Sequence, residues 1–211
     1  MFRIQVASSN PDKIAELRLG VQQWQGQAGQ SFPLAVEPVP GFAALPTCEE
    51  DTGSFVGNAA KKALHYSRLV SGLVLADDSG LEVDVLGGAP GVSSHRFAGP
   101  GATDADNNAK LLRQMFGIPA AKRTARFVCE LTLARKGRLL AQFRGMAEGI
   151  LLESPRGEGG FGYDPLFLDT ELHKTFAEFS REEKLQRSHR GRALRALLDW
   201  LAAQKTSAIL Q

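Results

Sequence analysis

Two clusters of acidic residues have the chemistry of a divalent-cation site. Glu49, Glu50 and Asp51 lie in a polar segment before a predicted helix, and Asp77 and Asp78 directly follow the apolar segment LVLA. Mg²⁺ binds one or two protein carboxylates and completes its coordination with water and substrate phosphates. Acids from two separate loops therefore predict a Mg²⁺ site. The alternative is that these acids cap helices and turns in solvent.

The segment SSNPDK, between a predicted strand and a predicted helix, has the features of a phosphate site. A helix N-terminus presents unpaired backbone N–H groups and a partial positive charge, and a lysine one turn into the helix adds a full charge. Serine and asparagine are also ordinary helix caps, so capping is the alternative interpretation. The residues concerned are Ser8, Ser9, Asn10, Pro11, Asp12 and Lys13.

A glycine-rich segment, residues 155–165, has the features of a nucleobase contact. It contains a formal G-x-G-x-x-G spacing, but prolines at both ends argue against the strand-to-helix setting of a dinucleotide fingerprint. We expect a flexible loop in which Phe161 and Tyr163 offer faces for stacking and Asp164 accepts a hydrogen bond from a base. The alternative is a glycine-rich turn whose aromatic side chains pack in the core.

Basic residues lie at the predicted start of the last helix. Ser188 is placed to cap this helix, and His189 and Arg190 fall in its first turn. Cations at a helix N-terminus oppose the helix dipole unless an anion or a polar ligand is also present. A ligand contact and a solvated basic face are therefore both open. Ser180 and Glu183, just upstream, have the spacing of a capping box.

These groups must be positioned by alternating strands and helices. Apolar periodicity predicts four helices, which start at Pro11, start at Ser54, span 103–115 and include the leucines of 194–201. The helix from Ser54 is expected to have one apolar face, formed by Phe55, Val56, Ala59, Ala63 and Leu64. It predicts strands over 2–6, 34–39, 73–76, 81–86, 124–134 and 138–151, with an acidic turn at 77–80. The order indicates an α/β fold with a mixed sheet rather than a purely parallel one.

The composition is that of an ordinary globular protein. The chain has 211 residues, 43% of them hydrophobic and 23% charged, and a net charge of +2. The length predicts one domain, residues 1–211, or two intimately packed lobes rather than a string of modules. A net charge near zero argues against a nucleic-acid partner. Cys48 and Cys129 indicate neither a zinc site nor a disulfide framework. Without a signal-peptide pattern or a membrane-length apolar run, we expect a cytoplasmic protein with no membrane contact.

Several common catalytic signatures are absent from the sequence, namely the P-loop, H-E-x-x-H and G-x-S-x-G motifs. The motifs that remain are phosphate donors, a carboxylate cluster, a base-stacking loop and a basic pair near the C-terminus. This combination indicates a nucleotide ligand.

The same motifs carry a family resemblance. The blocks SSNPDKIAE, SFVGNAAKKA, LADDSGLEVDVLGGAPGVSSHRFAG and GGFGYDPLF, followed by EEKLQRSHRGRAL, occur in the order and spacing of the inosine triphosphate pyrophosphatases. The resemblance spans nearly the whole chain. It implies an α/β fold with a long central mixed β-sheet, flanking helices and two lobes around a nucleotide-binding cleft. It also implies a homodimer and Mg²⁺-dependent cleavage of ITP, dITP and XTP to the monophosphate and pyrophosphate.

The resemblance also implies residue roles. Asp78 would be the general base and, with Glu49, the metal ligand, although the EED sequence leaves Glu50 as an alternative. This chain has Ser8 and Ser9 where the family usually has threonine and glycine, so close backbone approach at Ser9 is altered. The implied substrate contacts are Ser8, Ser9, Asn10, Pro11, Asp12, Lys13, Ser79, Phe161, Gly162, Tyr163, Asp164, Lys184, His189 and Arg190.

Two other functions fit the same motifs. The first is a pyrophosphatase that removes other modified nucleotides, although the segments SHR and FGYD favour a purine. The second is a nucleotide-binding regulator without catalysis. Because a binding protein does not need a water-activating carboxylate, Asp78 and its acidic partner favour the enzyme.

Overall fold

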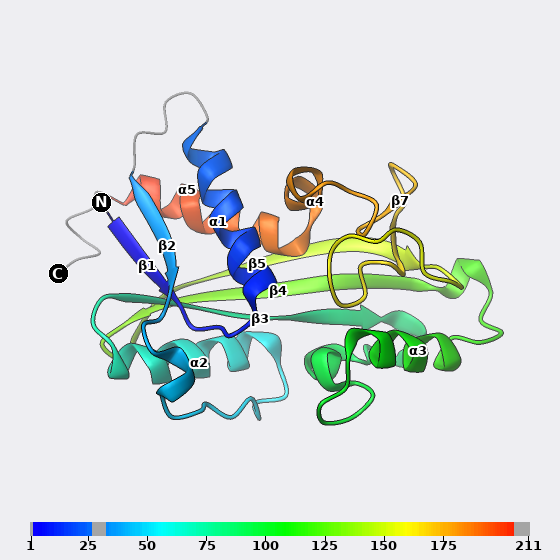
Figure 1. Ribbon diagram of the computed structural model, residues 1–211, viewed down its shortest axis with the longest axis horizontal. Helices are drawn as coiled ribbons and strands as arrows, with labels where there is room; N and C mark the ends of the chain where they lie inside the picture. The colour runs from blue at the N-terminus through cyan, green and yellow to red at the C-terminus, as the bar shows by residue number, and fades with distance from the viewer. Residues whose placement is uncertain (1, 27–32, 205–211) are drawn as a thin grey trace. The chain divides into compact units, whose positions relative to one another are not determined.

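The computed structural model describes residues 2–26 and 33–204 (Figure 1). The helices in this part of the chain are α1 (Pro11–Gln25), α2 (Phe55–Leu69), α3 (Asp104–Gln114), α4 (Arg181–Arg187) and α5 (His189–Ala203). The strands are β1 (Phe2–Val6), β2 (Leu34–Pro38), β3 (Leu73–Val83), β4 (Thr124–Arg135), β5 (Arg138–Leu151), β6 (Phe167–Asp169) and β7 (Lys174–Thr175).

The strands form one mixed sheet in the order β2-β1-β3-β4-β5-β6-β7. β1 is parallel to β2 and β3, with Ile4 opposite Val36 on one side and Leu73 on the other. β6 is antiparallel to both β5 and β7. The predicted α/β fold with a mixed central sheet and flanking helices is therefore confirmed.

The chain is organised as two compact units. Unit 1 contains the described residues of Met1–Asp78, Cys129–Gly145 and His189–Gln211, and unit 2 contains Ser79–Val128 and Met146–Ser188. Each unit has its own hydrophobic core, so each is described separately below.

In unit 1, helices cover both faces of the sheet. Figure 1 shows α1 and α5 on one face and α2 on the other. Successive side chains of a strand point to opposite faces. Leu73 and Leu75 of β3 accordingly pack in the core formed with α1 and α5, whereas Val74 and Ala76 pack in the core formed with α2. This alternation decides where the acidic residues that follow in β3 must point.

The core of unit 2 is rich in aromatic side chains. Leu81 of β3 and Leu111 of α3 belong to it, together with three phenylalanines in contact. The Phe127 and Phe167 ring centroids are 4.7 Å apart, and those of Phe167 and Phe176 are 4.8 Å apart. This core supports the loop that contains residues 161–164.

The predicted acidic turn at 77–80 is wrong, because β3 runs without interruption from Leu73 to Val83. The two aspartates need no solvated turn, since both are buried against positively charged partners. Gly80 is explained by close packing rather than by a turn. A Cβ at this position would lie 2.3 Å from Ser94 Oγ, which accepts a 2.9 Å hydrogen bond from the Leu81 amide. Glycine thus lets the turn containing Ser94 pack against the strand.

Most of the other local predictions are confirmed. Asn10 caps α1, α2 begins at Phe55 next to the expected start at Ser54, and Ser180 forms the predicted capping box with Glu183. Two predictions are wrong. Val56 is 42% exposed because it lies off the buried face of α2, and 84–86 forms a 3-10 turn where the strand 81–86 was expected to continue. Ser188 lies at the C-terminal end of α4, directly before α5.

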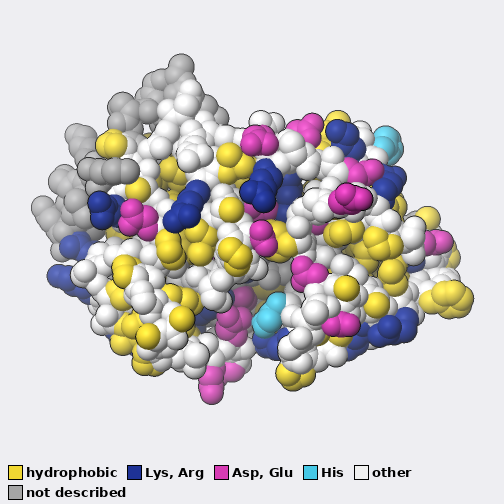
Figure 2. Space-filling model, in the orientation of Figure 1, with side chains coloured by type: hydrophobic (Ala, Val, Ile, Leu, Met, Phe, Trp, Pro, Cys, Tyr) yellow, Lys and Arg dark blue, Asp and Glu magenta, His cyan; other side chains and the backbone are white. Residues whose placement is uncertain are grey.

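Charged side chains of both signs lie on the surface. Figure 2 shows basic and acidic side chains interspersed over the visible face, with no broad basic patch on it. Among the described residues, no helix combines the length and apolar character needed to cross a membrane.

Candidate active site

Asp78 lies on the face of β3 that packs against α2. Asn58 Nδ2 donates to Asp78 Oδ2 at 3.2 Å, and Lys62 Nζ lies 3.1 Å from Asp78 Oδ1. Lys62 also donates to the backbone carbonyl of Asp77 at 2.7 Å. Residues four apart share one face of a helix, so α2 brings two donors to a single carboxylate.

Glu50 completes this cluster. Its Oε1 lies 3.0 Å from Lys62 Nζ, so one ammonium group contacts two carboxylates. Burial raises the pKa of Asp78, and Glu50 adds to this rise while Lys62 opposes it, leaving the pKa above its usual value. Burial alone would lower the pKa of Lys62, but Asp78 and Glu50 raise it. Lys62 therefore stays charged, and Asp78 is a stronger base than an exposed aspartate.

Glu50, rather than the exposed Glu49, contacts Lys62, the lysine that also contacts Asp78. Glu49 is exposed, whereas Glu50 is half-buried against Lys62. Asn58 holds the segment that follows, because its Oδ1 accepts from the Thr52 amide at 3.1 Å and the Thr52 hydroxyl at 2.8 Å. The loop geometry thus favours the alternative acid of the EED sequence.

Glu50 and Asp78 fit a Mg²⁺ ion by their chemistry. Both offer carboxylate oxygens, and the ammonium of Lys62 already contacts both. In the described ranges, no three His, Cys, Asp or Glu side chains cluster to hold a metal on their own. One or two carboxylates are what Mg²⁺ takes from a protein when substrate phosphates and water supply the other ligands.

Asp77 lies on the opposite face of β3, toward α1 and α5. Its Oδ1 accepts from Lys13 Nζ at 2.6 Å, and its Oδ2 accepts from Arg190 Nε at 2.8 Å. Burial alone would raise the pKa of Asp77, but Arg190 and Lys13 hold it well below its usual range. Arg190 also contacts Glu16 through its NH1 group, at 2.5 Å. The carboxylate form of Asp77 is therefore strongly favoured, and it contacts two cations.

The capping interpretation of SSNPDK is confirmed. Asn10 Oδ1 accepts from the amides of Asp12 and Lys13, at 2.9 and 3.1 Å, and Ser8 Oγ accepts from the Asn10 amide at 3.1 Å. These first-turn amides therefore already have an acceptor. Of the other residues in the segment, Ser9 and Pro11 are exposed. The ammonium of Lys13 is the part of this segment that the fold directs toward the acids of β3.

In unit 2, Phe161, Asp164 and Lys184 form a second cluster. Lys184 is buried, and its Nζ lies 2.5 Å from Asp164 Oδ2 and 4.5 Å from the centroid of the Phe161 ring. Asp164 Oδ2 also accepts from the Phe161 amide at 2.9 Å. A half-buried aromatic ring is thus held beside a buried cation, an arrangement suited to an aromatic, electron-rich ligand.

Tyr163 does not offer a stacking face, contrary to expectation. Its ring is buried in the core of unit 2, and its hydroxyl donates to the carbonyl of Ser94 at 2.8 Å. Burial raises the pKa of the phenol, which keeps it neutral. The core-packing alternative therefore holds for Tyr163, while Phe161 remains the half-buried ring of the loop.

The structure divides the predicted site residues between the two units. His189 and Arg190, buried at the start of α5, belong to unit 1 with the segment 8–13 and Asp78. Ser79, half-buried directly after Asp78, belongs to unit 2 with the segment 161–164 and Lys184. The functional group of Arg190 is engaged by Asp77 and Glu16 within unit 1.

Sequence reasoning missed two polar residues of the cluster around Asp78. Asn58 and Lys62 lie within an apolar helical pattern, which by itself indicates only a buried helix face. Their spacing is informative, because an amide and an amine four positions apart both lie on the buried face of α2. A buried lysine requires an acidic partner, so this spacing indicates that an acid faces α2, but not which acid it is.

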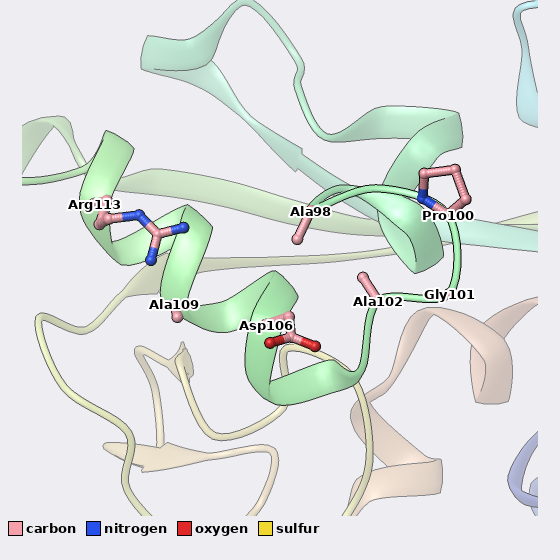
Figure 3. A pocket seen from close by; sticks show the side chains of 7 residues that line it. All are labelled: Ala98, Pro100, Gly101, Ala102, Asp106, Ala109 and Arg113. Atoms are coloured by element: carbon pink, nitrogen blue, oxygen red, sulfur yellow. The ribbon is translucent and has the colours of Figure 1, made fainter.

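A pocket in unit 2 lies beside α3 and has a volume of about 410 Å³ (Figure 3). It is lined mostly by small side chains from the segment 98–102, with Asp106, Ala109 and Arg113 of α3. None of the predicted site residues lines it, so it is separate from the chemistry described above.

The mixed sheet, the buried acid and lysine cluster and the aromatic loop define an α/β protein with the groups to bind a cation, phosphates and an aromatic base. The model of the Ham1 family matches residues 4–200, and the chain belongs to this family.

Named relatives and solved structures agree with this assignment. The dITP/XTP pyrophosphatase of Syntrophobacter fumaroxidans is 46% identical over 90% of this chain and 84% of its own length. The protein of the same name from an Exiguobacterium species is 47% identical, covering 93% and 95%. The Coxiella burnetii HAM1 structure superposes with a TM-score of 0.83 at 36% identity, covering 97% of this chain and all 100% of that one.

Proposed function

We propose that this chain is a nucleoside triphosphate pyrophosphatase that hydrolyses non-standard purine nucleotides, ITP, dITP and XTP, to the monophosphate and pyrophosphate. Membership of the Ham1 family and the names of its relatives support this activity. The observation that carries the proposal is the contact of Lys62 with both Asp78 and Glu50, because it places a raised-pKa carboxylate beside a second acid and a buried cation.

In this proposal Asp78 is the general base. It orients a water molecule for in-line attack on the α-phosphorus and accepts its proton, and pyrophosphate leaves. Two features support this role: the pKa of Asp78 lies above that of an ordinary aspartate, and Asn58 and Lys62 fix both carboxylate oxygens. A fixed orientation matters because a misplaced base loses its alignment with the attacking water.

Asp78 and Glu50 would hold Mg²⁺, with Glu49 as the alternative that the family resemblance indicates. When bound, the ion would withdraw charge from the phosphate oxygens that it contacts. Lys13 and Lys62 add positive charge for the triphosphate, which matters because phosphoryl transfer depends mainly on positioning and electrostatics. Ser8, Ser9 and Asn10 remain the proposed substrate contacts next to Lys13.

Base selection is proposed to involve Phe161 and Lys184. Phe161 supplies a ring for stacking, and Lys184 Nζ, which contacts Asp164, lies 4.5 Å from the centroid of that ring. A 6-oxo purine presents an acceptor at position 6, where adenine presents a donor. A site built to donate there would leave polar groups unpaired with ATP, and such mismatches are strongly rejected. His189 and Arg190 are retained as proposed contacts from the family resemblance.

Three further properties belong to the proposal. Residues 1–211 act as one catalytic domain, two copies form a homodimer, and the enzyme works in the cytoplasm. The dimer is supported by the family resemblance and is tested by light scattering after gel filtration.

The decisive experiment follows the phosphorus products. Purified protein is incubated with ITP, dITP, XTP, GTP, ATP, 7-methyl-GTP and a modified pyrimidine nucleoside triphosphate, with and without Mg²⁺, and the products are identified by ³¹P NMR. We expect monophosphate and pyrophosphate from ITP, dITP and XTP, only with the metal. Diphosphate plus phosphate as products would contradict the proposed reaction. A preference for other modified nucleotides would support a pyrophosphatase with a different substrate, and binding without turnover would support a nucleotide-binding regulator.

A further inference from the structure

Two side chains of α3 hold the backbone of Gly162 from both sides. Asp104 Oδ2 accepts from the Gly162 amide at 2.6 Å, and Asn108 Nδ2 donates to the Gly162 carbonyl at 2.9 Å. Asp104 and Asn108 are four positions apart and therefore lie on the same face of the helix. All three residues belong to unit 2. One residue of the loop is thus fixed at both its N–H and its C=O.

The fixed residue controls the direction of the loop. Gly162 has φ of +63°, a left-handed conformation in which the chain turns between Phe161 and Tyr163. On one side, Tyr163 is anchored in the core through Ser94. On the other side is Phe161, whose ring lies over Lys184. The position of Gly162 therefore helps to set the position of the Phe161 ring.

Asn108 makes this contact at a cost to the fold. Its Oδ1 is buried and has no hydrogen-bond partner among the described residues. An unsatisfied buried acceptor destabilises a protein. Stability alone therefore does not explain an asparagine here, and the hydrogen bond from its Nδ2 to the loop offers a reason.

We infer that Asp104 and Asn108 are positioning residues for base recognition, acting through Gly162 on the placement of Phe161. The inference rests on the proposed function, because it assumes that Phe161 contacts the base of a purine nucleotide. Neither side chain needs to touch the substrate. Their loss misplaces the stacking ring while the groups around Asp78 are unchanged, so the affinity for the base falls and the chemical step does not.

The test compares Asp104→Ala and Asn108→Ala with the wild-type protein. With ITP, each variant is expected to raise KM roughly tenfold, as for the loss of one strong hydrogen bond, with kcat within about twofold of wild type. The dissociation constant for IMP, measured by calorimetry, rises by a similar factor. Asp104→Asn, whose side-chain oxygen can still accept from the Gly162 amide, restores most of the affinity.

The control is Lys110→Met on the same helix. Lys110 Nζ donates to the carbonyl of Phe97 at 2.6 Å, and in the described part of the chain no hydrogen bond or ion pair joins Lys110 to residues 161–164. This variant removes a comparable bond between α3 and a loop, so it lowers the unfolding temperature without changing KM. A purely structural role for Asp104 and Asn108 would give the same pattern as this control.

The outcomes separate the two proposals. If wild-type protein hydrolyses ITP and the folded variants keep its KM and IMP affinity, only the positioning inference is overturned. If wild-type protein neither hydrolyses ITP nor binds IMP, the proposed function fails and the inference fails with it. If an alanine variant does not fold, Asn108→Asp tests the positioning role instead. This isosteric change replaces the Nδ2 donor by an oxygen facing the Gly162 carbonyl, so the inference requires a higher KM.

Discussion

Asp77 and Asp78 are consecutive residues of β3, yet the pKa values of their carboxyl groups shift in opposite directions. Burial raises both, but Asp77 faces Arg190 and Lys13, whereas Asp78 shares the single ammonium of Lys62 with Glu50. The alternation of side chains along a strand produces this difference. One carboxylate is held as an anion, and its neighbour is left as a base.

Replacing Asp78 by Asn should abolish most turnover without unfolding the protein. Loss of a general base typically costs about 10² to 10⁴ in rate, and the amide keeps the shape of the carboxylate. The measurement is kcat with ITP, together with the urea midpoint of unfolding as the control for folding. Turnover close to wild type would rule out Asp78 as the base.

Replacing Glu50 by Gln should raise the Mg²⁺ concentration needed for half-maximal rate more than the matched change Glu49→Gln. Glu50 lies beside Lys62 and Asp78, whereas Glu49 is exposed. We expect Glu50→Gln to need at least a tenfold higher Mg²⁺ concentration for half-maximal rate. A loss of about 1.4 kcal/mol in the free energy of Mg²⁺ binding has that effect. The reverse order, with the larger effect at Glu49, would show that the family alignment identifies the ligand correctly.

Asp77→Asn should destabilise the fold in a pH-dependent way. Because the pKa of Asp77 is depressed in the folded protein, its contribution is present above the unfolded pKa and is lost as pH falls toward the folded pKa. Removing this partner of buried Arg190 should cost about 3 kcal/mol or more at pH 7. The difference in unfolding free energy between wild type and variant should shrink below about pH 4. A pH-independent difference would contradict this assignment.

Gly80→Ala should lower the unfolding free energy by about 1–3 kcal/mol, as in other overpacked sites. Its Cβ would meet Ser94 Oγ at 2.3 Å and the Gly91 carbonyl oxygen at 2.7 Å. Gly26→Ala is the control, since its Cβ would lie no closer than 3.5 Å to its neighbours and its φ of −73° suits alanine. Equal stability of the two variants would mean that the turn containing Ser94 moves away freely.

Local features of the fold were predictable because their causes are local. Asn10, Ser54 and Ser180 cap helices through amides two or three positions away. The strands β4 and β5 were predictable for the same reason, since a turn with positive φ at Lys136 and Gly137 joins them. The 77–80 segment was mispredicted because aspartates and glycine are typical of turns, and their partners in this fold are distant in sequence.

The sequence by itself determined the element types, the mixed α/β class and the residue types able to bind a phosphate, a cation and a base. Only the tertiary structure decided which of these residues meet. Asp77 and Arg190 are 113 positions apart, and Asp104 and Gly162 are 58 apart. Capping and periodicity act over a few residues, but such pairs are formed by strand order and helix packing. For that reason the partners of Asp78 and the position of Phe161 could not be derived from neighbouring residues alone.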